Sequence, residues 1–188
     1  MLGVLSTLLK LWFLPKNKSL PCNVSSKVKE ADKKMKSIRP PREITRVPRS
    51  ISEHLKYWKA SELRSFLLFY SVPVLNGILN DDYFQHYMLF AQALFMIMQP
   101  TISRRSLNVA REMLIEFNRK FTYLYPKSTQ TLNFHQLMHL CDDISFIEQL
   151  YMYSCFVYEG KNCHFMKFVS GTEHVDKQSI SAVALILQ

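Results

Sequence analysis

Two histidines, His135 and His139, stand four residues apart in a segment with helical periodicity, and Asp142 follows three residues later. This spacing would place both imidazoles and the Asp142 carboxylate on one face of a helix, where they could bind zinc. The residue after His135 is not the glutamate that a metalloprotease would require, and the neighbouring leucines favour a packed helix face. We therefore expect these side chains to be structural and predict no metal site, with these three residues as the weak candidates.

The four cysteines are too few for a disulfide scaffold and form no CxxC pair, so we expect reduced thiols. Cys155, Cys163 and His164 could add metal ligands, but their spacing is not that of a known zinc site. Glycine-rich phosphate loops, serine nucleophile elbows and Cys-His catalytic signatures are absent from the sequence. We expect no cofactor and no small-molecule substrate.

Basic residues are the stronger functional candidates. Up to Arg64 the chain has 15 basic and 5 acidic residues, a net of +10, whereas the rest has 9 and 10, a net of −1. Prolines should hold four arginines in an extended stretch of about 30 Å that could bind phosphates. These arginines could instead pin the stretch to the helical body through Glu43, Glu53 or Glu62. The predicted nucleic-acid-binding residues are Arg39, Arg42, Arg46, Arg49, Lys56, Lys59 and Arg64.

A run of lysines precedes the proline-containing stretch. For these residues alone we favour a solvated face over a binding role, because exposed lysines are common on soluble proteins. The run comprises Lys27, Lys29, Lys33, Lys34 and Lys36.

We expect these residues to lie on or between helices. Residues 2–13 have apolar side chains at helical spacing and form an amphipathic helix that Pro15 ends. Ser50 and Glu53 have the spacing of a capping box, so a helix should follow over 53–71, with Asp81 and Asp82 capping a later one. Further helices are predicted over 82–98, 104–124 and 134–149. Ser103 should begin the second of these. The core should include Trp58, Leu67, Leu94, Leu114, Phe117 and Leu137.

No segment reaches the ~20 apolar residues that a spanning helix needs. The start also lacks the basic region and cleavage site of a secretory signal, and a hydrophobic anchor over residues 2–14 is the less favoured alternative. We expect a nuclear or cytoplasmic protein that is not secreted.

Several blocks of sequence occur in the order seen in one known family. They are Ser37–Ile51 (SIRPPREITRVPRSI), Tyr57–Ser71 with YWKASELR and LLFYS, Asn133–Leu140 (NFHQLMHL), Tyr153–Glu159 (YSCFVYE) and Gly171–Gln178 (GTEHVDKQ). Over roughly residues 2–178 the chain closely resembles the C-terminal region of CACTA (En/Spm)-type DNA transposases, a domain of unknown function after the transposase core.

The resemblance implies a piece of an RNase H-like recombinase, in which carboxylates hold two divalent ions for phosphoryl transfer. Mg²⁺ suits such oxygen ligands, and two ions stabilise both the attacking and the leaving oxygen. The family's upstream aspartates would precede Met1, so Glu159 is the candidate relic of the third acidic residue. Mg²⁺ would therefore be bound only in a complete transposase.

We predict a mainly α fold: a single helical domain with a basic extended N-terminal segment and at most one short strand, at 151–158. By resemblance it is the C-terminal part of an RNase H-like transposase. The expected parts are an amphipathic helix (1–15), a basic Pro/Arg-rich extended segment (16–49), a helical transposase-derived domain (50–178) and an apolar tail (179–188).

The leading functional interpretation is a truncated or remnant CACTA-like transposase fragment that is not an enzyme as it stands and has a DNA-association or scaffold role. The alternative is a protein–protein interaction module that uses Met-rich and aromatic faces. The least favoured is a transposase subunit completed in trans. Expected partners are DNA without sequence preference, a second copy or a full-length transposase, and no membrane.

Overall fold

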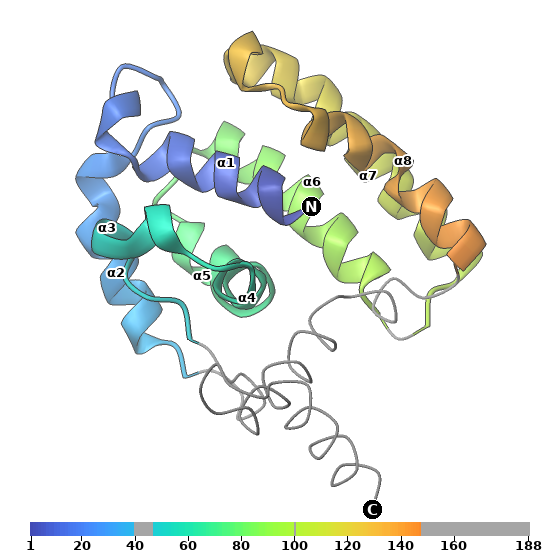
Figure 1. The fold of residues 1–188 in the computed structure, drawn as a ribbon, viewed down its shortest axis with the longest axis horizontal. Coiled ribbons are helices and arrows are strands. Elements are labelled where there is room, and N and C mark those ends of the chain that lie inside the picture. The colour runs from blue at the N-terminus through green and yellow to red at the C-terminus, as the bar shows by residue number, and fades with distance from the viewer. Residues whose placement is uncertain (40–46, 100, 148–188) are drawn as a thin grey trace, which may run out of the picture. The chain divides into compact units, whose positions relative to one another are not determined.

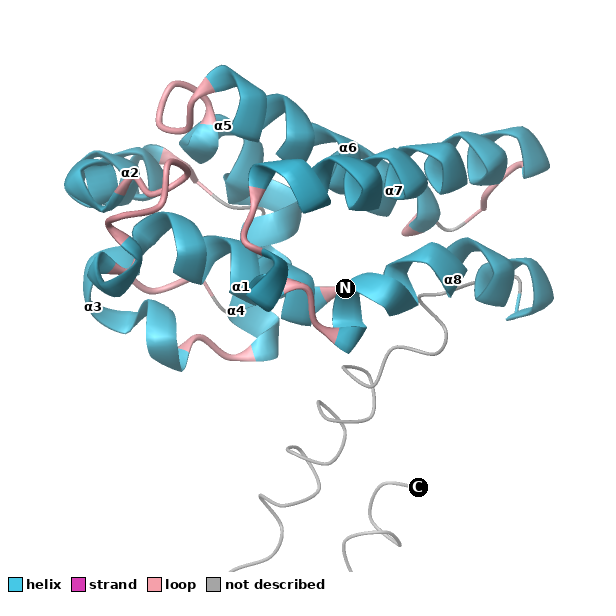
Figure 2. Ribbon diagram, turned by 90° about the horizontal axis from the view of Figure 1, so that it is seen from above, coloured by secondary structure: helices cyan, strands magenta, loops and turns pink. Residues whose placement is uncertain are grey.

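The computed structural model describes residues 1–39, 47–99 and 101–147 (Figure 1). All of them belong to the first of two compact units, Met1–Gln149 and Leu150–Gln188. These described ranges form helices and no strand (Figure 2), which confirms the mainly α class. The predictions for Arg42, Arg46, Glu159, the strand at 151–158, the thiols of Cys155 and Cys163, His164 and the tail 179–188 lie outside the described residues.

Eight α-helices make up the described part of the chain. They are α1 (Leu2–Phe13), α2 (Val28–Ser37), α3 (Ile51–His54), α4 (Ala60–Ser65), α5 (Ser71–Leu75), α6 (Asp81–Ile97), α7 (Arg104–Leu124) and α8 (Leu132–Ile147). Single-turn 3₁₀ segments are η1 (Pro15–Asn17), η2 (Ser25–Lys27), η3 (Leu55–Tyr57) and η5 (Lys127–Thr129), and η4 (Phe66–Tyr70) is π-helical. No helix in these ranges is long and apolar enough to cross a lipid bilayer.

Helix α1 has the predicted bounds but is a core element, in contact with both α4 and α8 (Figure 1). Its buried side chains include Leu5, Leu9 and Trp12, none of which is exposed to solvent. Trp12 packs edge-on against Tyr87 at 5.5 Å between ring centroids, and its Nε1 donates to the Tyr125 hydroxyl at 3.2 Å. A helix that is apolar on most sides is stable only when buried, so α1 depends on the rest of the body.

Helices α6, α7 and α8 pack in sequence, α6 on α7 and α7 on α8, through an aromatic cluster. The predicted three- and four-residue spacing in α7 brings Phe117 and Phe121 inward, and Phe121 meets Phe134 of α8 at 4.1 Å between centroids. Ser103 caps α7 as predicted, since its hydroxyl accepts from the Ser106 amide at 3.0 Å. The six residues predicted to be core are all buried: Trp58, Leu67, Leu94, Leu114, Phe117 and Leu137.

The segment 16–49 is not wholly extended, because residues 28–37 form α2. Between Lys27 and Ser37 there is no proline or glycine, and Ala31, Asp32 and Met35 at helical spacing are buried. The prolines of this segment thus restrict only their own neighbours. The prediction of an extended segment was therefore wrong for residues 28–37, which form α2.

The helix predicted over 53–71 is broken and also runs further than expected. The backbone of Trp58 is extended, with ψ 129°, so helical structure ends after η3 and begins again at α4. Pro73 does not end the helix, because α5 follows directly on the π-helical η4 and includes Pro73. The π-helical η4 precedes it, and the Ser71 hydroxyl donates to the Leu67 carbonyl at 2.8 Å, which satisfies that acceptor.

The predicted capping box at Ser50 is absent, because the N-terminus of α3 is capped from another helix. The Asp32 carboxylate of α2 accepts from the Ile51 amide at 2.6 Å and from the Ser52 amide and hydroxyl at 3.2 and 2.6 Å. Glu53 remains exposed. A cap supplied by a residue distant in the sequence cannot be predicted from local spacing.

The predicted caps of α6, Asp81 and Asp82, lie in the first turn of that helix, and the N-cap position is occupied by Asn80.

Candidate nucleic-acid interface

The lysine run is divided into two groups by the folding of α2. Lys29, Lys33 and Lys36 are exposed and occupy positions i, i+4 and i+7, so they share one outer face of the helix. The opposite side of α2 is held in the core by Ala31 and Met35. We call Lys29, Lys33 and Lys36 the lysine stripe.

The other lysines of α2 and η2 have partners in the body. Lys34 Nζ lies 2.6 Å from the Asn76 carbonyl oxygen, and Lys27 Nζ lies 3.3 Å from the Ile78 carbonyl oxygen. Both acceptors flank Gly77, whose φ of 74° is the left-handed conformation that favours glycine. Lys27 and Lys34 therefore hold α2 against the turn between α5 and α6.

The lysine stripe is without an anionic partner in the described ranges. No carboxylate there forms an ion pair with Lys29, Lys33, Lys36 or the exposed Arg39 that follows α2. Lys36 also lies in the last turn, where a cation interacts favourably with the helix dipole. Apart from the exposed Glu30, the outer face of α2 is thus an uncompensated positive surface.

Arg49 acts as a structural clasp, which was the alternative left open for the arginines. Its guanidinium donates to Glu62 at 2.8 and 2.9 Å and to the Tyr57 carbonyl at 2.7 Å. The Glu62 side chain is buried and also accepts from the Arg49 and Lys59 amides. The hydrogen bond from Arg49 is the main cause that lowers the pKa of Glu62 to about 2, so the carboxylate stays charged. Arg49 is thereby committed to the body.

The remaining predicted DNA-binding residues lie in or between η3 and α4. Lys56 of η3 and Lys59 before α4 are exposed, and Arg64 of α4 is half-buried. The helix that η3 continues, α3, is in contact with α2.

The weak metal candidates separate in the structure. His135 and His139 are exposed on α8, which corrects the expectation of a packed face, and their Nε2 atoms are 3.4 Å apart. The Asp142 carboxylate is instead 2.7 Å from Arg111 Nη2 of α7. In the part of the chain that the structure describes, no group of three or more His, Cys, Asp or Glu side chains could hold a metal ion.

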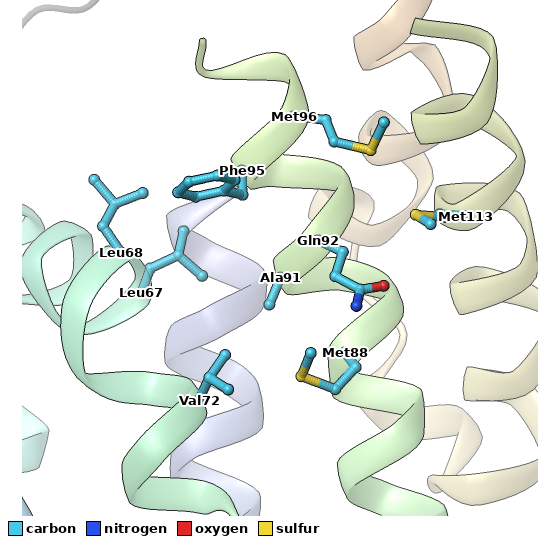
Figure 3. A pocket seen from close by; sticks show the side chains of 9 residues that line it. All are labelled: Leu67, Leu68, Val72, Met88, Ala91, Gln92, Phe95, Met96 and Met113. Carbon is cyan, nitrogen blue, oxygen red and sulfur yellow. The ribbon is translucent and has the colours of Figure 1, made fainter. Parts of the chain in front are cut away.

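An apolar groove of about 430 Å³ opens on α6, and the sequence did not locate it (Figure 3). Leu67, Leu68 and Val72 form one wall, facing Phe95 of α6, and Met88, Met96 and Met113 line the rest with Ala91 and Gln92 (Figure 3). Phe95 of α6 is 58% exposed. Since α6 is apolar on several faces, periodicity could not show which face would stay uncovered.

No protein-family model, curated protein or solved structure matches this chain. The resemblance to CACTA transposases therefore stays a prediction.

Proposed function

We propose that this chain is a non-catalytic, CACTA-like transposase-derived module that associates with DNA phosphates, in a nuclear role, through the outer face of α2. The observation that carries the DNA-binding part is the lysine stripe, in which Lys29, Lys33 and Lys36 share one exposed face and have no carboxylate partner in the described ranges. The transposase origin is supported by the sequence blocks quoted above. Strand cleavage in the presence of Mg²⁺ would overturn the non-catalytic part.

The dimensions of the stripe suit a nucleic-acid backbone. Lys29 to Lys36 spans about 10 Å along the helix axis, over which one DNA strand presents about three phosphates. Arg39 extends the positive surface beyond the helix end. Three or four neutralised phosphates would give weak, salt-dependent binding that is largely indifferent to sequence.

A charge-matched pair of variants tests this proposal. We expect K29Q/K33Q/K36Q to weaken duplex binding and to reduce the slope of log affinity against log salt by about three. The control K16Q/K18Q/K127Q removes the same charge from three other exposed lysines and should change the slope little. Fluorescence anisotropy across a salt series measures both, with circular dichroism as the check on folding. Equal slopes for the two variants would show that binding depends on net charge, and the interface would then be wrongly placed.

Arg49 does not belong in such a test, because replacing it would also break its ion pair with Glu62. Arg39 is the arginine of the described stretch that can be changed without that complication, since it is exposed and beyond the end of α2. Adding R39Q to the triple variant should reduce the slope further.

A second candidate function is favoured by the groove on α6. Flexible methionines and an exposed aromatic ring are typical of surfaces that accept an amphipathic helix. Because the chain carries a net charge of +9, an acidic helix from another protein is favoured over a second copy. An acidic amphipathic peptide should bind in a titration, and Phe95→Gln should abolish its binding while DNA affinity is unchanged. Loss of both bindings would show that the variant is misfolded.

A further inference from the structure

The exposed histidine pair on α8 is not used by the proposed DNA interface. The helix buries Phe134, Leu137, Cys141 and Ile144 on its inner face, and His135 and His139 lie on the outer face one turn apart. Their ring centroids are 5.0 Å apart with an interplanar angle of 73°, and the two Nε2 atoms approach to 3.4 Å.

This separation is that of two ligands on one metal ion. Zinc–nitrogen bonds of about 2.0–2.1 Å at a tetrahedral angle hold the two nitrogens about 3.3 Å apart. A direct N–H···N hydrogen bond, by contrast, is long at this distance and competes with water on an exposed helix face. The two nitrogens therefore already have the separation that chelation of one cation requires.

We propose that His135 and His139 form a two-histidine site for Zn²⁺. Imidazole nitrogen suits Zn²⁺ as a ligand, whereas Mg²⁺ prefers oxygen. The proposal is independent of DNA binding, because the pair belongs to α8 and the lysine stripe to α2.

The coordination by this pair is incomplete, so the site is an open one. The nearby carboxylate of Asp142 is paired with Arg111. Water or an external ligand supplies the remaining positions, as in zinc sites that keep a coordination position free. His135 also lines a groove of about 610 Å³ between α7 and α8, with Arg119 and Gln130 among the other lining residues, so the proposed site adjoins space for such a ligand.

A variant with unchanged composition provides the sharpest test. H139Q/Q136H moves the second imidazole from position 139 to the exposed position 136, directly after His135. The number of histidines is unchanged, but the four-residue spacing is lost. Isothermal titration of the full chain with Zn²⁺ should show binding that both this variant and H135A weaken at least about tenfold, since losing a ligand costs at least as much as losing an outer-shell partner. Circular dichroism checks that α8 is intact.

Substitution with Co²⁺ distinguishes this site from one built on cysteines. Nitrogen and oxygen ligation should give visible absorption without a thiolate charge-transfer band, and H135A should remove it. Zn²⁺ affinity that is unchanged in both variants, or a thiolate band in the wild-type spectrum that H135A leaves intact, would overturn the proposal.

Discussion

His86 is a buried titratable side chain in an aromatic environment. It is 1% exposed, its ring stacks on Phe117 at 4.3 Å between centroids, and its Nε2 lies 2.9 Å from the Phe117 carbonyl oxygen. Donation from Nε2 to that oxygen leaves Nδ1 as an unprotonated acceptor, which has no hydrogen-bond partner in the described ranges. Burial lowers the pKa of His86 to about 4, although the hydrogen bond to the Phe117 carbonyl opposes this shift; Lys120 has a smaller lowering effect and Glu116 a smaller raising one.

Because His86 is buried in its neutral form, we expect the free energy of unfolding to decrease already at a pH above the range in which carboxylates titrate. The unfolded chain takes up a proton near the ordinary histidine pKa, ~6.5, whereas the folded chain does so only near about 4. Stability is therefore constant above the unfolded pKa and falls as the pH drops below it. We expect a loss of about 2 kcal/mol between about pH 7.5 and pH 5, measured by urea unfolding. His86→Phe should flatten this dependence, and an equal slope in that variant would contradict the assignment.

Glu62 affects stability in a lower pH window. Its pKa is lowered to about 2 chiefly by Arg49, so its contribution is present above the ordinary glutamate range and is lost as the pH falls toward about 2. The two windows do not overlap above pH 5, so the effect of His86 can be measured there without interference from Glu62.

Helix α3 shows how a short element depends on a neighbour. Four residues cannot form a stable helix alone, and Ser50 supplies no side-chain cap. Asp32 provides one from α2, while Lys27 and Lys34 attach α2 to the turn beyond α5. Thus the inner side of α2 stabilises its neighbouring elements, and the outer side presents the lysine stripe.

Removing the cap should destabilise the protein without changing its charged outer face. Asp32→Ala is expected to cost about 1–2 kcal/mol of unfolding free energy, because two amides and one hydroxyl lose their acceptor. Glu30→Ala is the matched control, since it removes an exposed carboxylate from the same helix. Chemical denaturation measures both variants. Equal midpoints for Asp32→Ala and the wild type would show that the cap contributes nothing.

The described unit is organised around its first helix. Helix α1 contacts α4 on one side and α8 on the other, and Trp12 connects it to Tyr87 of α6 and to Tyr125 after α7. The first helix is therefore part of the hydrophobic core of this unit.

A pair of aromatic truncations tests this organisation. Trp12→Ala should cost about 3–5 kcal/mol, because a fully buried ring is lost and a cavity remains. Tyr57→Ala, at a ring that is 72% exposed, should change the unfolding free energy by less than about 0.5 kcal/mol. Thermal and urea unfolding provide the comparison. A tolerated Trp12→Ala would mean that α1 is peripheral to the stability of the unit.

Helical periodicity was enough to predict the mainly α class, the bounds of α1 and α7 and the buried face that Leu114 and Phe117 share. These features follow from the 3.6-residue repeat, which acts over a few turns of contiguous chain. Charge counting likewise identified the basic N-terminal third, since composition does not depend on the fold.

Partners far apart in the sequence could not be predicted in the same way. Asp32 caps α3 across 19 residues, and Arg49 was one of several arginines that could reach a glutamate. Lys34 has the Asn76 carbonyl as a partner, which nothing in the local sequence distinguishes from its neighbour Lys33. Which lysines remain free, which carboxylate is buried and which face of α6 stays open all depend on how helices pack. Packing brings together groups whose sequence separation carries no local signal, so these assignments require the three-dimensional arrangement.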